Sequence, residues 1–454
     1  MEKSSKLQWI FPILGNKDVD YKKEALAGVT TFLTMAYIVA VNPSILAETG
    51  MDAGALVTAT CLSAGIACIL MGLVANLPFA LASGMGLNAF FAYKVVLGDG
   101  ISWEIALTAI FIEGIIFILL SLFKVREAVV NAIPTAMKHA VTAGIGLFIA
   151  FVGFVGSGLV IASESTLVEM GEFNITVVIA LIGVIIIAVL DKKRVKGSIL
   201  FGILASTLLA WGYALLNPTT ASELGIYLPN GIFKFESMAP IAGKLDFSGI
   251  FNGDLVNFIV IILTFLFVDF FDTVGTLVGV CSRANMLNED GTVPNAGRAL
   301  LVDAIATTYG AVMGTTTVTT YVESSTGVAA GGRTGYTAIT TGILFLIAMF
   351  FSPIFIAIPS CATAPALIYV GYLMLGAVNN IDFGSITDGV PAFLTISTMV
   401  LTYSIGDGLT IGILSYVAIN LISNLFAKKK EEKVEISIVM YVLAVLFILK
   451  LVFL

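Results

Sequence analysis

Residues 315–332 read TTTVTTYVESSTGVAAGG, and the fold of the whole chain can be worked out from this stretch. Five threonines and two valines surround Tyr321 within residues 315–322. Such β-branched runs disfavour helix and favour an extended backbone. The hydroxyl residues at 324–326 are suited to capping a short helix that runs through GVAAGG. We therefore predict a strand joined to a half-helix.

The rest of the chain is strongly apolar. Of its 454 residues, 58% are hydrophobic and 12% are charged, and the mean hydropathy is +1.02, whereas soluble proteins have about 25% charged residues. This composition excludes a water-soluble enzyme. The net charge is -7 and no long basic run occurs, so no nucleic acid partner is expected. The predicted fold class is an all-α polytopic membrane protein.

Apolar runs of about 20 residues predict membrane-spanning helices. Twelve such runs, together with two Gly-rich or Thr-rich discontinuous segments at 78–97 and 315–331, give fourteen spans. The twelve runs are 25–42, 54–75, 102–123, 134–155, 174–190, 197–216, 255–281, 297–314, 335–357, 361–379, 390–406 and 408–426. The apolar residues 435–454 follow, and the sequence leaves open whether they span the membrane or lie along it.

Lysine and arginine concentrate on one side of these spans. Most of the 23 basic residues fall in the amino-terminal segment and in alternate loops, which the positive-inside rule places in the cytoplasm. Removing either discontinuous segment would invert the loops that follow it, so the charge pattern supports both. We expect a multi-pass protein of the cell membrane with a cytoplasmic amino terminus. Residues 1–24 lack an apolar core, so no removable signal peptide is expected.

The fourteen spans divide into two weakly similar halves. Span 7 contains KGSILFGILASTLLAW (196–211) and span 14 contains GDGLTIGILSYVAINL (406–421), which share GIL. Each half has a discontinuous segment as its third span. Because seven is an odd number, the halves would lie in opposite orientations. This is the inverted-repeat arrangement of secondary transporters, which bind substrate at broken helices near the membrane midplane.

The earlier discontinuous segment, PFALASGMGLNAFFAY (78–93), repeats the pattern of the later one. Gly84 and Gly86 lie at its break, and Asn88 lies just inside the following helix. Unpaired backbone at membrane depth is tolerated only inside protein or beside a wet cavity, toward which a half-helix would point its positive end. We therefore expect both segments to line one cavity. The plainer alternative is a pair of ordinary kinked helices.

Acidic residues inside the spans are candidates for function, because they are costly in hydrocarbon and form proton relays in transporters. Glu323 lies at the junction of the predicted strand and half-helix. Asp269 and Asp272 are three residues apart in FVDFFDTVGTLVGV (267–280) and share a helix face, which Thr276 continues. The alternative is that these acids only hold helices together.

Other reactive side chains add no further chemistry. Glu113 and Asp303 are expected to pack helices, and His139 to lie at the solvated start of a span. The four cysteines lie in or beside apolar runs, where a thiol acts as a small hydrophobe. No HExxH, CxxC or Walker motif occurs. We predict no metal, no cofactor and no enzymatic activity.

Three motifs together resemble a known family. FVDFFDTVGTLVGV, TTTVTTYVESSTGVAAGGRTG and ASGMGLNAFFAY are similar to motifs of the AzgA-like purine permeases, within the nucleobase and cation symporters, and the resemblance covers nearly the whole chain. It implies two inverted repeats of seven spans, in which spans 3 and 10 contribute short antiparallel strands. It also implies a core domain at 1–124 (spans 1–4) and 251–357 (spans 8–11). The implied gate domain is formed by 125–250 (spans 5–7) and by 358–454 (spans 12–14 and the apolar carboxyl-terminal segment).

The resemblance also implies the site and the function. The family's span 3 asparagine corresponds to Asn88, and its acidic positions in spans 8 and 10 correspond to Asp272 and Glu323. The predicted substrate-binding residues are Asn88, Asp272, Thr276, Glu323, Ser324 and Ser325, the predicted proton-coupling residues are Asp269, Asp272 and Glu323, and Phe90, Phe91 and Tyr321 are candidates to stack on a ring. The implied activity is import of adenine, guanine or hypoxanthine by alternating access, coupled to H+ or Na+. A homodimer is one assembly compatible with it.

Other functions remain as alternatives. An anion transporter or exchanger of the sulfate-permease type would have the same architecture, but carboxylates at its site would repel the anion. A uracil or xanthine permease would carry a different span 10 motif. A channel would need a continuous pore, which suits neither two half-helices nor a midplane site.

Overall fold

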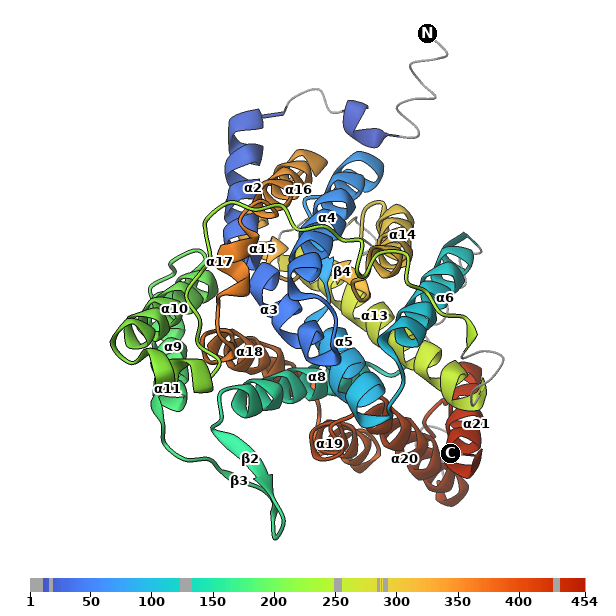
Figure 1. Cartoon of the computed structure of the whole chain (residues 1–454). Coiled ribbons are helices and arrows are strands. Elements are labelled where there is room, and N and C mark those ends of the chain that lie inside the picture. The colour runs from blue at the N-terminus through green and yellow to red at the C-terminus, as the bar shows by residue number, and fades with distance from the viewer. Residues whose placement is uncertain are drawn as a thin grey trace.

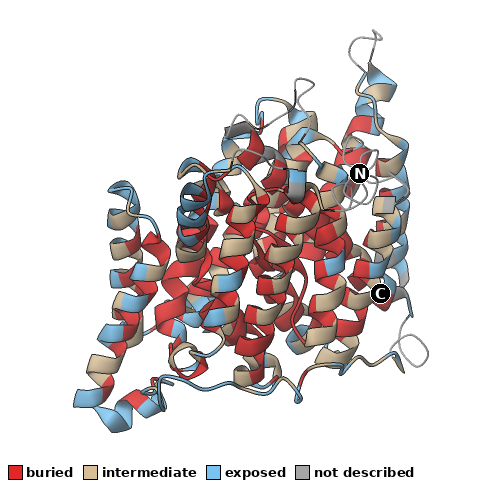
Figure 2. Cartoon of the chain, turned by 90° about the horizontal axis from the view of Figure 1, so that it is seen from above, coloured by how far each residue is buried: buried red, intermediate tan, exposed pale blue. Residues whose placement is uncertain are grey.

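The chain folds into a bundle of helices with two small sheets (Figure 1). The computed structural model describes residues 11–15, 19–122, 133–248, 255–283, 286, 288, 293–427 and 433–453. Within these residues, eight helices are long and apolar enough to cross a membrane. Buried residues fill the middle of the bundle and exposed residues lie at its edges (Figure 2). The predicted multi-pass membrane protein is thus confirmed.

The first half of the chain is mostly helical and contains one strand followed by a short helix (β1 and α5) and one β-hairpin (β2–β3). Its elements are η1 (Pro12–Gly15), α2 (Tyr21–Met35), α3 (Ile38–Leu46), η2 (Ala47–Thr49), α4 (Ala53–Leu70), η3 (Met71–Ala75), β1 (Leu81–Ser83), α5 (Met85–Ala89), η4 (Phe90–Gly98), α6 (Trp103–Leu122), α8 (Thr135–Gly156), β2 (Val160–Ser163), β3 (Leu167–Met170), α9 (Ile175–Lys192), α10 (Ser198–Leu216) and α11 (Pro218–Glu223).

The second half repeats this order. Its elements are α13 (Leu255–Arg283), α14 (Ala296–Met313), β4 (Val318–Thr320), α15 (Ser324–Ala329), α16 (Gly335–Ala348), α17 (Ser352–Ile356), α18 (Ser360–Leu375), η5 (Gly376–Asn380), α19 (Ile386–Leu401), α20 (Ile405–Phe426) and α21 (Ile438–Phe453). In each half the third span is a strand followed by a short helix, as predicted, and the two strands pair with each other. The predicted inverted-repeat fold is confirmed.

Three spans differ from the prediction. The first, expected as one helix at 25–42, is interrupted at Ala36–Tyr37, where α2 ends and α3 begins. The thirteenth, expected at 390–406, is α19 and ends four residues earlier than α20 begins. Tyr403 between them has a φ of 55°, a left-handed backbone that stops the helix. The eleventh, expected at 335–357, is divided as well, because α16 ends at Ala348 and α17 begins at Ser352. Hydropathy alone did not reveal these breaks.

Close packing between the helices depends on glycine. A Cβ at Gly146 of α8 would lie 2.9 Å from the carbonyl oxygen of Gly371 in α18, and one at Gly342 of α16 would lie 2.6 Å from that of Gly65 in α4. Small residues let membrane helices approach in this way. The helices α8, α9, α10, α18, α19 and α20 pack mainly on one another, and α2, α4, α6, α13, α14 and α16 form a second group, in which α13 packs mainly on α6 (Figure 1).

Residues 226–246, which we call the strap, cross one face of the bundle without regular structure (Figure 1). The strap is bonded to the second helix group. Thr58 Oγ1 of α4 donates to the Glu236 carbonyl at 2.9 Å, Gly243 N donates to the Val312 carbonyl of α14 at 2.7 Å, and Ser352 Oγ donates to the Lys234 carbonyl at 2.7 Å. Neither the strap nor the β2–β3 hairpin was predicted.

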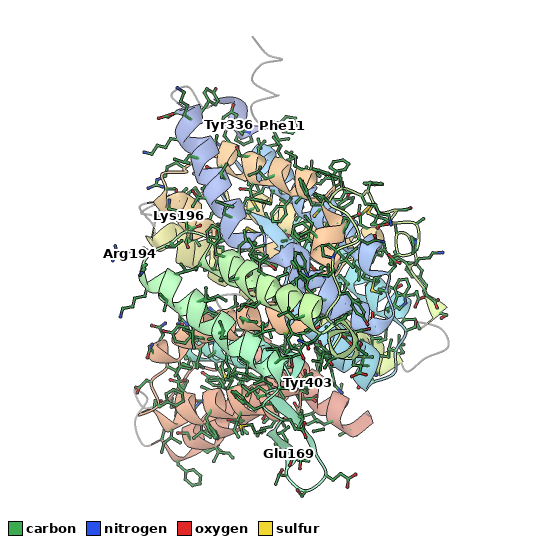
Figure 3. All side chains as sticks on the ribbon, turned by 60° about the vertical axis from the view of Figure 1, so that its left-hand side comes forward. Phe11, Glu169, Arg194, Lys196, Tyr336 and Tyr403 are labelled. Carbon is green, nitrogen blue, oxygen red and sulfur yellow. The ribbon has the colours of Figure 1, made fainter. Side chains whose placement is uncertain are left out.

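The basic turn between α9 and α10 and the β2–β3 hairpin lie in different parts of the molecule. Arg194 and Lys196 lie at the turn between α9 and α10, whereas Glu169 lies on the β2–β3 hairpin, which projects from the bundle (Figure 3). The cysteines Cys61, Cys68, Cys281 and Cys361 are all free and buried, as expected. Of the apolar residues 435–454, 438–453 form α21, which packs against α13 and α20.

Candidate functional site

The two discontinuous spans meet at a buried strand pair. β1 and β4 are antiparallel, with Leu81 opposite Thr320 and Ser83 opposite Val318. The pairing is extended by Gly84 N, which donates to the Thr317 carbonyl at 3.0 Å. A Cβ at Gly84 would lie 3.0 Å from the Thr319 side chain, so this position favours glycine. Because the strands are antiparallel, α5 and α15 leave the pair at opposite ends, and the pair joins the two halves of the chain.

Glu323 lies where β4 gives way to α15, in the N-cap position of that helix. Its carboxylate oxygen Oε1 accepts a hydrogen bond of 2.7 Å from the hydroxyl of Tyr37. Tyr37 is fully buried and lies at the break between α2 and α3. Glu323 itself is only partly buried, and its neighbour Val322 is 50% exposed. The junction is therefore not fully enclosed by the surrounding helices.

Asp272 of α13 lies near the same junction. It is within electrostatic range of Glu323, and also of Asp303 in α14. Its side chain is partly exposed, whereas Asp269 is fully buried. Thr276, predicted to continue the face of Asp272, is only 9% exposed. Of the two span 8 acids, Asp272 is thus the one that an entering molecule can reach.

Two other predicted residues hold the strand pair. Asn88 is fully buried, and its side-chain oxygen accepts hydrogen bonds from Ser83 Oγ at 3.0 Å and from the Thr316 hydroxyl. Its Nδ2 has no hydrogen-bond partner among the described residues, so this group can still donate. Ser324 is also fully buried, and its Oγ accepts from Ala80 N at 3.0 Å.

The cap of α15 differs from the prediction. Ser324, Ser325 or Thr326 was expected as N-cap, but Glu323 occupies that position without a side-chain cap bond. The Ser324 hydroxyl is used by the backbone of the first discontinuous span instead, and the Thr326 hydroxyl donates back to the Glu323 carbonyl at 2.7 Å. Ser325 is partly exposed and lies beside Glu323 in sequence.

A buried threonine network behind the strands was not predicted. Thr273, which directly follows Asp272 in span 8, donates to Asp303 Oδ1 at 2.9 Å, and its Oγ1 lies 2.7 Å from Thr319 Oγ1. Thr317 Oγ1 lies 3.5 Å from Glu113 Oε2. The acids Glu113 and Asp303 are fully buried, consistent with the helix-packing role expected for them. Their partners lie on a different span, so only the fold could identify them.

Helix α2 follows α15 closely along its length. Thr34 Oγ1 lies 3.0 Å from Thr326 Oγ1, and a Cβ at Gly327 would collide with the Thr31 hydroxyl and lie 2.8 Å from the Ala27 carbonyl. Together with the Tyr37 bond, these contacts fix Glu323 from the first span. The sequence signal was a series of hydroxyl side chains at helical spacing in residues 30–37, in an otherwise apolar run.

The aromatic residues near the junction are largely enclosed. Phe91 is fully buried, Phe90 is 3% exposed and its ring contacts that of Phe265 edge-on at 5.2 Å. The Tyr321 hydroxyl donates to the Ser83 carbonyl. Tyr321 is also within electrostatic range of Asp272 and Glu323.

The opposite wall comes from the other helix group. A Cβ at Gly86 of α5 would lie 2.7 Å from Ile145 of α8, and one at Gly406 of α20 would lie 3.2 Å from Thr264 Oγ1 of α13. The junction thus lies close to the boundary between the two groups. Among the described residues, no cluster of three or more His, Cys, Asp or Glu side chains is placed to hold a metal.

Comparison with known proteins gives the family. The model of the Permease family matches residues 22–410. The guanine/hypoxanthine permease PbuG of Bacillus subtilis is 46% identical over 446 residues, covering 96% of this chain and 97% of the relative. The adenine permease AdeP of Escherichia coli is 40% identical over 434 residues, covering 95% and 93%. The transmembrane domain of the cyanobacterial bicarbonate transporter BicA superposes with a TM-score of 0.64 at 16% identity, covering 87% of this chain and 98% of that one.

Proposed function

The chain belongs to the permease family, as its motifs predicted, and we propose that it imports the purine nucleobases adenine, guanine and hypoxanthine by proton symport. The observation that carries this proposal is the junction of β4 and α15, where two reachable carboxylates, Asp272 and Glu323, lie within electrostatic range of each other. Relatives that share 40–46% identity over almost the whole chain are named guanine/hypoxanthine or adenine permeases.

The chemistry of the junction suits a purine. Carboxylate oxygens accept from ring N–H and amino groups, and the unbonded Nδ2 of Asn88, which is fully buried here, would donate to a ring nitrogen or carbonyl once the residues that cover it move. The hydroxyl of Ser325 can donate or accept a hydrogen bond. The rings of Phe90 and Tyr321 are candidates to stack on a flat base, but both are enclosed and would have to move to reach it. Thr276, Ser324 and Asp269 would support the site from behind.

Proton coupling follows from the pair of acids. Two carboxylates near one another in a membrane site are not both ionised without cost, so one can take up a proton as the base binds. We assign this role to Asp272 and Glu323, with the enclosed Asp269 as a third candidate. Na+ in place of H+ is the alternative coupling ion.

Alternating access would use the two helix groups as domains. The proposed core contains spans 1–4 (1–124) and spans 8–11 (251–357), and the proposed gate contains spans 5–7 (125–250) and spans 12–14 (358–454). The strap belongs to the first stretch of the gate (125–250) by sequence, yet its hydrogen bonds go to the core helices α4 and α14. We therefore assign the strap to the core. The basic turns and the positive-inside rule support a cytoplasmic amino terminus in the cell membrane.

An anion transporter is the second candidate, because a bicarbonate transporter domain has the same fold. The reachable charges at the junction are both carboxylates, which repel an anion. A uracil or xanthine permease is the third. These two alternatives would transport bicarbonate, or uracil or xanthine, in place of the purines.

Uptake into proteoliposomes tests the proposal. The purified protein is reconstituted, and radiolabelled adenine, guanine and hypoxanthine are supplied with an inward proton gradient, an inward Na+ gradient or neither. We expect concentrative uptake of at least one purine that collapses with a protonophore. Uptake of uracil, xanthine or bicarbonate in place of the purines would contradict the assignment. Accumulation driven by an Na+ gradient alone would keep the purines as substrates but identify Na+ as the coupling ion.

A further inference from the structure

A cavity outside the candidate site lies between α6, α13 and α21. Its volume is about 270 Å³. Phe117 of α6 and Leu266 and Phe270 of α13 form one wall, and Ile438, Val442 and Leu443 of α21 form the other. Every side chain that lines it is a hydrocarbon or an aromatic ring. This cavity shares no lining residue with the junction of β4 and α15.

Water is a poor occupant of this space. The volume equals that of roughly nine water molecules at about 30 Å³ each, but a buried water needs two to four polar partners. The lining offers none. An apolar cavity of this size is therefore either empty, which forfeits dispersion contacts, or filled by hydrocarbon.

The cavity is continuous with the outer surface of α21. Ile438 and Val442, which line it, are 81% and 53% exposed, and they border the exposed side chains of Val445 and Ile448 farther along the helix. In a membrane-embedded chain, this surface faces lipid tails. A tail lying along α21 can enter the cavity without crossing any polar group.

We propose that this cavity binds one acyl chain of a membrane phospholipid. Lys433 is exposed in the extended segment five residues before Ile438, at the end of α21 where the cavity begins. An ammonium group there can pair with the phosphate of the same lipid, which favours an anionic headgroup. This binding site is independent of the purine site and goes beyond the proposed function.

Such a lipid would have a structural consequence. Helix α21 packs against α20 and also against α13, which belong to different helix groups. An acyl chain between α21 and α13 would therefore lie at the interface between these two helix groups. It would stabilise the position of α21 against α13 and so raise the thermal stability of the folded chain.

Native mass spectrometry of the full chain tests the proposal. Leu443→Trp fills the cavity from a buried position (3% exposed), and Ile448→Trp places the same ring on the exposed face of the same helix (50% exposed). After washing in mild detergent, palmitoyl-oleoyl phosphatidylglycerol is added to each protein. We expect the wild type and Ile448→Trp to retain one lipid per chain and Leu443→Trp to lose at least fivefold in occupancy.

Thermal unfolding provides the second readout. The same lipid should raise the Tm of the wild type and of Ile448→Trp, but not that of Leu443→Trp. Equal retention by both tryptophan variants, or no retention by the wild type, would overturn the proposal. A dimer that Leu443→Trp disrupts without any loss of lipid would assign the cavity to a second copy and also overturn it. If Leu443→Trp does not fold, Val439→Phe on the same wall replaces it.

Discussion

At the level of single residues, the site joins side chains that are far apart in sequence. The hydroxyl of Tyr37 from the first span donates to the carboxylate of Glu323 from the tenth, 286 residues later. A hydrogen bond to a charged acceptor is shorter and stronger than a neutral one. It fixes one carboxylate oxygen and leaves the other available to a ligand. The orientation of Glu323 therefore depends on Tyr37.

Substitution of Glu323 should weaken purine binding. Glu323→Gln keeps the shape but exchanges one acceptor oxygen for a donor, so the loss of a charge-assisted hydrogen bond, about 1.5–3 kcal/mol, should lower affinity roughly tenfold to a hundredfold. Glu323→Asp keeps the charge with a shorter reach and should lose less. Calorimetric titration of adenine, guanine and hypoxanthine measures both. Unchanged affinity in Glu323→Gln would make this acid structural.

Substitution of Tyr37 should have a smaller effect on the same site. Tyr37→Phe removes only the hydroxyl, so Glu323 loses one charge-assisted hydrogen bond of about 1.5–3 kcal/mol. Because this bond orients the carboxylate and does not itself contact the purine, only part of that loss should reach binding, and the KM for purine should rise roughly threefold to tenfold. Tyr372→Phe, on the exposed face of α18, is the matched control and should be neutral. Glu323→Gln should abolish the effect of Tyr37→Phe in the double variant. Additive losses would show that Tyr37 acts elsewhere.

Asp272 and Asp269 can be distinguished by their exposure. Asp272→Asn removes an acid that a ligand can reach, so pH-driven accumulation should be lost while the protein still reaches the membrane. Glu172→Gln, on an exposed loop, should leave accumulation intact. Uptake by Asp272→Asn at the wild-type level would exclude this acid from proton coupling. Loss of accumulation in Asp269→Asn but not in Asp272→Asn would assign the coupling role to Asp269.

At the level of elements, the sequence and its family resemblance predicted the two broken spans and their antiparallel strands, but not the packing of α2 on α15. The β-branched run at 315–322 gave β4 its extended backbone, and the charge alternation required both discontinuous segments. The break at Ala36–Tyr37 contains neither glycine nor proline, so no local signal marks it. The strap could not be predicted either, because its own backbone bonds to residues of distant helices.

The contact of α15 with α2 gives a test at this scale. Gly327→Ala would place a methyl group against the Thr31 hydroxyl and 2.8 Å from the Ala27 carbonyl, so α15 must move away from α2. Overpacking of this kind costs about 1–3 kcal/mol, and the shift should carry Glu323 away from Tyr37. We expect a lower Tm and a raised KM for purine.

Gly212→Ala is the control for this variant. A Cβ at Gly212 of α10 meets nothing within 4 Å, so its Tm and KM should match the wild type. Adding Thr31→Ala to Gly327→Ala removes the clashing hydroxyl and should restore part of the loss. A Gly327→Ala protein with wild-type KM would show that α15 is not positioned by α2.

At the level of the whole molecule, the site lies where the two repeats and the two helix groups meet. The pairing of β1 with β4 joins the repeats, and α8 and α20 approach α5 and α13 from the other group. The inverted repeat was predictable because an odd number of spans per half fixes its orientation. The exposure of Asp272 was not, because it depends on how separate spans pack around α13.

Movement of the groups against each other gives the last prediction. Gly406 of α20 lies opposite Thr264 of α13, where an added Cβ would be 3.2 and 3.3 Å from the two branch atoms of the threonine. Two cysteines here would have their Cβ atoms near the 3.5–4.5 Å that a disulfide needs. Oxidation of Thr264→Cys/Gly406→Cys should therefore stop purine uptake, and reduction should restore it. The control pair Thr395→Cys/Gly412→Cys joins α19 to α20 within one group, where a Cβ at Gly412 would be 3.0 Å from that of Thr395, so its oxidation should leave uptake intact. The native cysteines are buried and should not compete. Full uptake by the oxidised Thr264→Cys/Gly406→Cys protein would mean that α13 and α20 move together, and the boundary between core and gate would then lie elsewhere.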